Sequence, residues 1–138
     1  MRHALAIVIL TSGALGLCSC QSREADAQVY RKACDAGSPE ACFSLSLRYM
    51  HGDGVPKDAA RAASLFRKAC DAGYATGCGN LGTMYVYGNG VPQDKVKAAQ
   101  LYQKACDGGV AAACKALRKL RKSRAPRPPN LNTERPGA

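Results

Sequence analysis

The sequence predicts an all-α solenoid of antiparallel helix pairs, and two observations support that fold class. Pairs of cysteines that enclose seven residues recur every 36 residues, with the first cysteine of each pair at positions 34, 70 and 106. Residues 30–65 and 66–101 align without a gap and share 18 identical residues of 36. A period of this length indicates a stacked-repeat protein, in which neighbouring copies of one supersecondary unit pack against each other.

Each repeat contains two segments with the periodicity of an amphipathic helix. Apolar residues recur at i, i+4 and i+8 in one segment and at i, i+3 and i+7 in the other, so each set lies on one helix face. The first set is Ala62, Phe66 and Cys70, with Ala98, Tyr102 and Cys106 one period later; the second is Cys42, Leu45 and Tyr49, with Cys78, Leu81 and Tyr85. No segment sustains the two-residue alternation of a strand, so we expect no sheet.

Glycine and proline mark where these helices end. Gly-x-Gly-Val-Pro occurs at 52–56 and 88–92, and single glycines follow the other helices at 37, 73 and 109. Asp58 and Asp94 stand where a carboxylate can cap the next helix. We therefore expect six helices, at 24–36, 39–51, 58–72, 75–87, 94–108 and 110–122.

Residues 1–19 are typical of an export signal. The apolar run Ala4–Leu17 is too short to span a bilayer, which needs about 20 residues. Leu17-Cys18-Ser19-Cys20 resembles a bacterial lipobox and predicts lipidation of Cys20, with 20–23 as a short linker. Two alternatives remain open: secretion after cleavage behind Ala27, at Ala25-Asp26-Ala27, and an uncleaved anchor. Gln21, rather than Asp, after the lipidated cysteine favours the outer membrane, if the source has one; a periplasmic or secreted protein is the other expected location.

The cysteine count agrees with export. If Cys18 leaves with the signal and Cys20 carries lipid, six of the eight cysteines remain. They form three local pairs in a compartment where disulfides persist, so we expect Cys34–Cys42, Cys70–Cys78 and Cys106–Cys114 bonds. A zinc site is disfavoured because no C-x-x-C spacing occurs, and we expect neither a metal nor a cofactor.

Positive charge is concentrated at the carboxyl end. Residues 115–138 contain eight Lys or Arg and one Glu, whereas residues 20–114 contain 11 and nine. We expect a basic, Pro-rich, disordered tail at 123–138. The basic residues are either the polar outer face of a terminal repeat or a contact to anionic lipid, polysaccharide or an acidic partner; the candidates are Arg118, Lys119, Arg121, Lys122, Arg124 and Arg127. Export makes nucleic acid an improbable partner.

Three motifs resemble a known repeat family. Lys-Ala-Cys-Asp-Ala-Gly (32–37, 68–73), Leu-Gly-x-Met-Tyr-x-x-Gly-x-Gly-Val (81–91) and Lys-Ala-Ala-x-Leu-Tyr-x-Lys-Ala-Cys (97–106) are similar to Sel-one-like (Sel1-like) repeats, relatives of the tetratricopeptide repeat. The paired cysteines resemble the Helicobacter cysteine-rich branch, and the likeness covers 24–122. It implies an α/α solenoid with one disulfide in each motif, used as an adaptor for other proteins. Ser46 and Leu47 depart from the family pattern, as does Arg121 where the pattern has Tyr.

Binding is the function that these residues favour. The repeated positions build the core, which leaves the variable apolar positions as candidates for a protein or peptide groove in the cell envelope. These candidates are Phe43, Leu47, Met50, Tyr74, Met84 and Tyr87; the alternative is that much of this apolar surface packs against the neighbouring helix pair. The alternative, β-lactam binding or weak hydrolysis, comes from the resemblance alone, because Ser-x-x-Lys, Ser-Asp-Asn and Lys-Thr-Gly are all absent from the sequence. We propose no catalytic residues.

Overall fold

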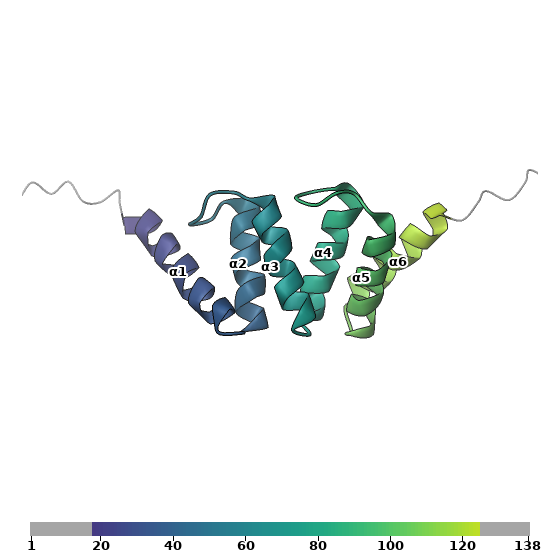
Figure 1. The fold of residues 1–138 in the computed structure, drawn as a ribbon, viewed down its shortest axis with the longest axis horizontal. Helices are drawn as coiled ribbons and strands as arrows, with labels where there is room; N and C mark the ends of the chain where they lie inside the picture. The colour runs from purple at the N-terminus through teal and green to yellow at the C-terminus, as the bar shows by residue number, and fades with distance from the viewer. Residues whose placement is uncertain (1–17, 125–138) are drawn as a thin grey trace, which may run out of the picture.

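The computed structural model describes residues 18–124, which fold into six helices joined by short connections (Figure 1). Each helix packs against the next one along the chain, and no strand occurs between residues 18 and 124. This arrangement confirms the predicted all-α solenoid. The helices are α1 Cys18–Asp35, α2 Pro39–His51, α3 Ala59–Asp71, α4 Ala75–Tyr87, α5 Lys95–Asp107 and α6 Ala111–Arg124.

The two predicted aspartate caps are confirmed. The Asp58 carboxylate accepts a hydrogen bond from the backbone N–H of Arg61 at 3.0 Å, and Asp94 accepts from the N–H groups of Val96 and Lys97 at 2.9 and 3.0 Å. Each carboxylate thus satisfies donors that the first turn of a helix leaves unpaired. Because these caps lie outside the helices, α3 and α5 begin one residue later than expected.

The first and last helices are longer than the sequence predicted. Helix α1 includes residues 20–23, which we expected to be a linker, and α6 continues through Arg124 rather than ending at 122. The physical reason is the same at both ends. Neither Gly nor Pro occurs within 18–36 or within 111–124, so nothing in the chain interrupts either helix.

Small residues bring the helices close together. Ala62, Ala98 and Ala105 are fully buried on α3 and α5, and Phe66 is 2% exposed between them and the neighbouring helices. Gly82 on α4 faces the ring of Tyr102 so closely that an added Cβ would lie 3.0 Å from it. The core is therefore built from close backbone approach as much as from large side chains.

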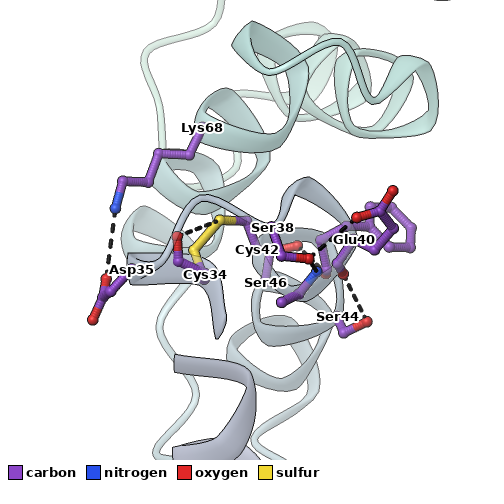
Figure 2. Close-up of a disulfide and its surroundings, with 10 residues drawn as sticks. Cys34, Asp35, Ser38, Glu40, Cys42, Ser44, Ser46 and Lys68 are labelled. Carbon is purple, nitrogen blue, oxygen red and sulfur yellow. Dashed lines mark hydrogen bonds and ion pairs between the residues drawn. A yellow bond between two sulfur atoms is a disulfide. The ribbon is translucent and has the colours of Figure 1, made fainter. Parts of the chain in front are cut away.

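All three predicted disulfides are present, one at each turn where an odd-numbered helix meets the following even-numbered one. The Cα atoms are 4.6 Å apart in Cys34–Cys42 and in Cys70–Cys78, and 4.8 Å apart in Cys106–Cys114. These separations lie in the normal range for a disulfide. Figure 2 shows the first bond beside the Ser38 cap of α2 and the Lys68–Asp35 ion pair.

The longer loops dock on the helix pair before them. Gly54 and Gly90 have positive φ angles of 70° and 68°, and each lies directly against the backbone of a preceding odd-numbered helix. A Cβ on Gly54 would collide with the carbonyl of Arg23 on α1, and one on Gly90 with that of Ala59 on α3. The Gly-x-Gly motif therefore joins successive repeats as well as ending a helix.

Candidate binding groove

Two hollows lie between the even-numbered helices, α2, α4 and α6. The first hollow has a volume of about 380 Å³ and is lined by both α2 and α4, and the second has about 340 Å³ and is lined by α4 and α6. Both include Asn80 and Thr83 of α4 in their walls. The two hollows therefore adjoin on one side of the solenoid, and we call them together the groove.

The first hollow is apolar at its base. Met84 is only 3% exposed and Phe66 2%, so both form the floor, whereas Leu47 and Met50 are half-buried walls. Tyr87 lies at the rim with 76% of its surface exposed. An aromatic side chain this exposed contributes little to the core and is free to contact a ligand.

The second hollow exists because a small residue replaces a large one. Gly79 occupies the repeat position that Phe43 holds one period earlier, and it lines this hollow with Val110 and Ala113. An added Cβ at Gly79 would meet Ala105 at 3.7 Å and Ala113 at 3.9 Å, which are ordinary contact distances. There is consequently room at this position for a side chain or for part of a ligand.

The six predicted groove residues divide into two groups. Leu47, Met50, Met84 and Tyr87 line the first hollow. Phe43 and Tyr74 line neither hollow. The Phe43 ring packs against those of Phe66 and Tyr74, with centroids 5.7 and 5.0 Å apart.

The structure adds polar groove residues that the sequence reasoning missed. The side chain of Asn80 is half-buried where the two hollows meet and makes no hydrogen bond within residues 18–124. The Thr83 hydroxyl lies 2.9 Å from that of Tyr102 and donates to the carbonyl of Gly79 at 3.1 Å. His51 is an exposed residue at the end of α2 and completes the rim. The three-residue spacing of Asn80 and Thr83 was the available signal, since it places both on one helix face.

Two buried tyrosines of the even-numbered helices accept hydrogen bonds from arginines of the odd-numbered helices. Arg31 on α1 and Arg61 on α3 donate to the Tyr49 hydroxyl at 3.0 and 3.4 Å. The hydrogen bond from Arg61 is the largest cause of a lowered pKa for Tyr49, opposed by burial and reinforced by Arg31. In the next repeat Arg67 donates to Tyr85 at 2.7 Å.

Arg121 occupies the same position in the last repeat, where the family pattern has Tyr. It donates to the Gln103 side chain at 3.0 Å, across the same 18-residue separation as Arg31–Tyr49 and Arg67–Tyr85. Gln103 in turn stands where the earlier repeats have Arg31 and Arg67. The hydrogen bond between helices is kept, with donor and acceptor exchanged.

The predicted basic residues fall on α6, apart from Arg127, which lies outside the described residues. The side chain of Cys20, the predicted lipidation site, is also outside them. Within residues 18–124 no group of three or more His, Cys, Asp or Glu side chains could hold a metal ion. No helix in that range is both long and apolar enough to cross a bilayer.

Comparison with known proteins identifies the repeat. Residues 39–74 and 75–110 match the Sel1 repeat, and these two matches cover α2 through α5 and their loops. The chain belongs to the Sel1 repeat family. Sel1 repeats form scaffolds that are typical of protein-interaction modules, and the observed fold is such a scaffold.

Three solved structures show the same fold. A protective antigen of uropathogenic Escherichia coli strains, described as having an SLR fold, is 33% identical with a TM-score of 0.69, over 70% of this chain and 21% of that one. A Sel1 repeat protein from Oxalobacter formigenes is 36% identical with a TM-score of 0.66, over 69% and 39%. Cysteine-rich protein B of Helicobacter pylori is 28% identical with a TM-score of 0.64, over 72% and 89%. No curated protein matches the chain.

The likeness to cysteine-rich protein B, a Helicobacter protein, bears out the predicted branch of the family, and this chain has three cysteine pairs of its own. The first two relatives are much longer proteins, of which this chain spans about a fifth and two fifths.

Proposed function

We propose that the protein is an exported lipoprotein, anchored through Cys20, whose groove binds an extended segment of a partner polypeptide in the cell envelope. In this proposal residues 1–19 are the signal peptide, the helical residues 20–124 are the binding module, and the basic tail follows them. One observation carries the binding proposal. Two hollows adjoin on one side of a rigid repeat scaffold, and they share residues of α4.

The chemistry of the groove suits a peptide with apolar side chains. Methionine and leucine walls adapt to apolar groups of different shape, and the exposed Tyr87 ring can cover one of them. Asn80 offers two donors and one acceptor at the junction of the hollows, which matches the acceptor and donor of a peptide bond. An extended peptide can therefore fill both hollows while Asn80 pairs with its backbone between them.

The contacts of α1 support lipidation at Cys20 over cleavage behind Ala27. Ala27 is 2% exposed and belongs to the core, and Asp26 forms an ion pair with Arg48 of α2 at 3.7 Å. Arg23 pairs with Asp53 at 3.4 Å. Cleavage behind Ala27 would remove all of these contacts and about half of α1, whereas cleavage before Cys20 leaves them intact. The three disulfides also fit an oxidising compartment.

Peptide selection tests the groove. Peptides enriched from a random library against the oxidised mature chain are measured by calorimetry against wild type, Gly79→Phe and Gly79→Ala. Phenylalanine restores the residue of the preceding repeat and fills the second hollow, whereas alanine adds one methyl group in ordinary contact and leaves it open. We expect Gly79→Phe to weaken binding at least tenfold and Gly79→Ala to leave it nearly unchanged.

A second variant tests the first hollow. Leu47→Ser removes an apolar wall residue that is only half-buried, so binding should fall while the fold persists. Phe43→Ser is the contrasting variant, because Phe43 lines neither hollow and packs on Phe66 and Tyr74, so its loss should lower stability first. Peptides that bind all of these variants as tightly as wild type would overturn the groove proposal.

The anchor and the β-lactam alternative have separate tests. Mass spectrometry of the mature protein should find an N-terminal lipid-modified Cys20, and an unmodified chain that starts at residue 28 would refute the anchor. Nothing among the described residues favours β-lactam chemistry, so we expect the oxidised protein to turn over no chromogenic β-lactam. Sustained turnover that disappears on reduction would replace the binding proposal with an enzymatic one.

A further inference from the structure

Helix α6 differs from the other helices in carrying charge of one sign. It contains six basic residues and no acidic ones: Lys115, Arg118, Lys119, Arg121, Lys122 and Arg124. Helix α1, at the opposite end of the solenoid, contains three basic and three acidic residues. Both end helices lack a neighbour on one side within residues 18–124 and need a polar surface there. Helix α1 has a polar surface built from charges of both signs, so the need for solubility does not explain why α6 carries only positive charge.

Two of the basic residues, Arg118 and Arg121, stand at positions that are buried in the earlier repeats. Arg118 occupies the position of Ser46 and Gly82, both of which are buried because the following helix packs over them. No helix follows α6 within the described residues, and Arg118 is exposed. A long cation at this position prevents another helix pair from packing closely here and leaves the end of the solenoid positively charged.

Four of these cations share one shallow depression. Lys115, Arg118, Lys119 and Lys122 line it, and their spacing of i, i+3, i+4 and i+7 places them on one side of the helix. All four are exposed, and none makes a side-chain hydrogen bond or ion pair within residues 18–124. Interaction with the helix dipole accounts for Lys122, which lies in the last turn, but not for Lys115, Arg118 and Lys119, which precede it.

The order of the helices places the end of α6 at the same edge of the molecule as the start of α1. Six antiparallel helices alternate in direction, so the first begins and the last ends at the edge that carries the longer loops (Figure 1). A lipid on Cys20 would hold this edge at a bilayer. The last turns of α6, with Arg121, Lys122 and Arg124, would then face the same surface.

We propose that α6 is a second membrane contact, which binds the phosphate headgroups of anionic phospholipids. The inference rests on the proposed lipid anchor for its geometry, and it adds the orientation that the anchored protein adopts. Each Lys or Arg close to an anionic membrane surface strengthens binding about fivefold, so a row of four to six cations suffices for a measurable contact. An anchor combined with a basic surface also holds a protein at a membrane more firmly than either does alone.

The test uses the mature chain with Cys20→Ser, so that no lipid contributes to binding. Its co-sedimentation is measured with vesicles of phosphatidylcholine alone and with vesicles of phosphatidylcholine and phosphatidylglycerol in equal parts. The test variant replaces Arg118, Lys119, Lys122 and Arg124 with Gln, because these are the cations toward the end of α6 that make no side-chain hydrogen bond or ion pair within residues 18–124. The matched control replaces Lys32, Lys57, Lys95 and Lys104 with Gln, which removes the same charge from exposed residues elsewhere.

We expect binding to the anionic vesicles alone, a loss of about 100-fold or more in the α6 variant, and less than a tenfold loss in the control. Binding should also fall steeply as salt shortens the Debye length from about 30 Å at 0.01 M to about 3 Å at 1 M. Equal losses in both variants, salt-independent binding, or no binding to anionic vesicles would each overturn the proposal. Binding to a sulfated polysaccharide but not to the vesicles would overturn it in favour of a carbohydrate partner.

Two further measurements separate this proposal from the others. The melting temperature of the α6 variant should equal that of wild type, and a large decrease would show that the cations stabilise the helix instead. Mass spectrometry of Cys20 and peptide binding in the groove do not depend on α6. Failure of the vesicle test would therefore leave the anchor and the groove standing, and failure of either would not alter the vesicle result.

Discussion

The central disulfide should stabilise the protein more than the last one does. Each bond closes a loop of about nine residues, which the chain-entropy model values at about 2.6 kcal/mol. Their surroundings differ: Cys70 and Cys78 are each 1% exposed, whereas Cys106 and Cys114 are half-buried. Loss of two buried sulfur atoms adds about 1–2 kcal/mol, by comparison with buried methylene groups. We expect Cys70→Ala/Cys78→Ala to cost about 4 kcal/mol and Cys106→Ala/Cys114→Ala about 3 kcal/mol.

Urea denaturation followed by circular dichroism at the helical minimum measures both losses. The slope of the unfolding free energy against urea must stay the same between variants, because a change in slope reports a different unfolding transition. A larger loss of unfolding free energy from removal of the half-buried Cys106–Cys114 bond than from removal of the buried Cys70–Cys78 bond would refute the reasoning from burial. Losses below about 1 kcal/mol in both variants would refute the loop-closure argument as well.

Three other predictions follow from single contacts. Gly79→Ala should raise stability by up to about 1 kcal/mol, because alanine favours the helix and its methyl group would meet only ordinary contacts. Gly82→Ala should lower stability, because its methyl group would lie 3.0 Å from the Tyr102 ring. Thermal melts that rank these two variants in reverse would contradict this. Gly90→Ala should destabilise more than Gly73→Ala, since both have positive φ but only Gly90 lies against backbone; equal urea midpoints would contradict this. The folded-state pKa of Tyr49 lies below its ordinary value of about 10, so its ionisation should add stability at alkaline pH, and this stability is lost as pH falls through the folded pKa. In an ultraviolet titration, Tyr49→Phe should lack the tyrosine that ionises at the lower pH in wild type. A titration curve identical to that of wild type would disprove this prediction.

Much of the fold could be predicted because each repeat contains residues that mark where its helices begin and end. The 36-residue period predicted the stacking, the aspartate caps predicted the starts of α3 and α5 to within one residue, and the single glycines at 37, 73 and 109 predicted the turns between the paired cysteines. The start of α1 and the end of α6 were not predicted in the same way. No breaker residue marks the start of α1, whereas Pro126 stands two residues after the end of α6 and is a stop signal that the predicted end at 122 did not use.

The groove was harder to predict than the fold. Large apolar residues in the variable positions were the signal on which the prediction rested, and that signal treats Phe43 and Leu47 alike. The structure separates them, because Phe43 packs against two aromatic rings while Leu47 faces the first hollow. The second hollow exists because Gly79 has no side chain and because α4 and α6 leave a space between them. The repeat alignment sets Gly79 opposite Phe43, but only the packed helices show that a hollow is left open there.

Site-specific photocross-linking tests most directly whether the groove side binds a polypeptide. A photoreactive phenylalanine analogue replaces Tyr87, which is 76% exposed at the rim of the first hollow, or Gln100, which is exposed on α5 outside the groove. Irradiation in intact cell envelopes should give a discrete protein adduct from position 87 that weakens when Gly79→Phe is added, and no such adduct from position 100. Adducts of equal yield from both positions, or none from position 87 in folded and fully oxidised protein, would contradict the account.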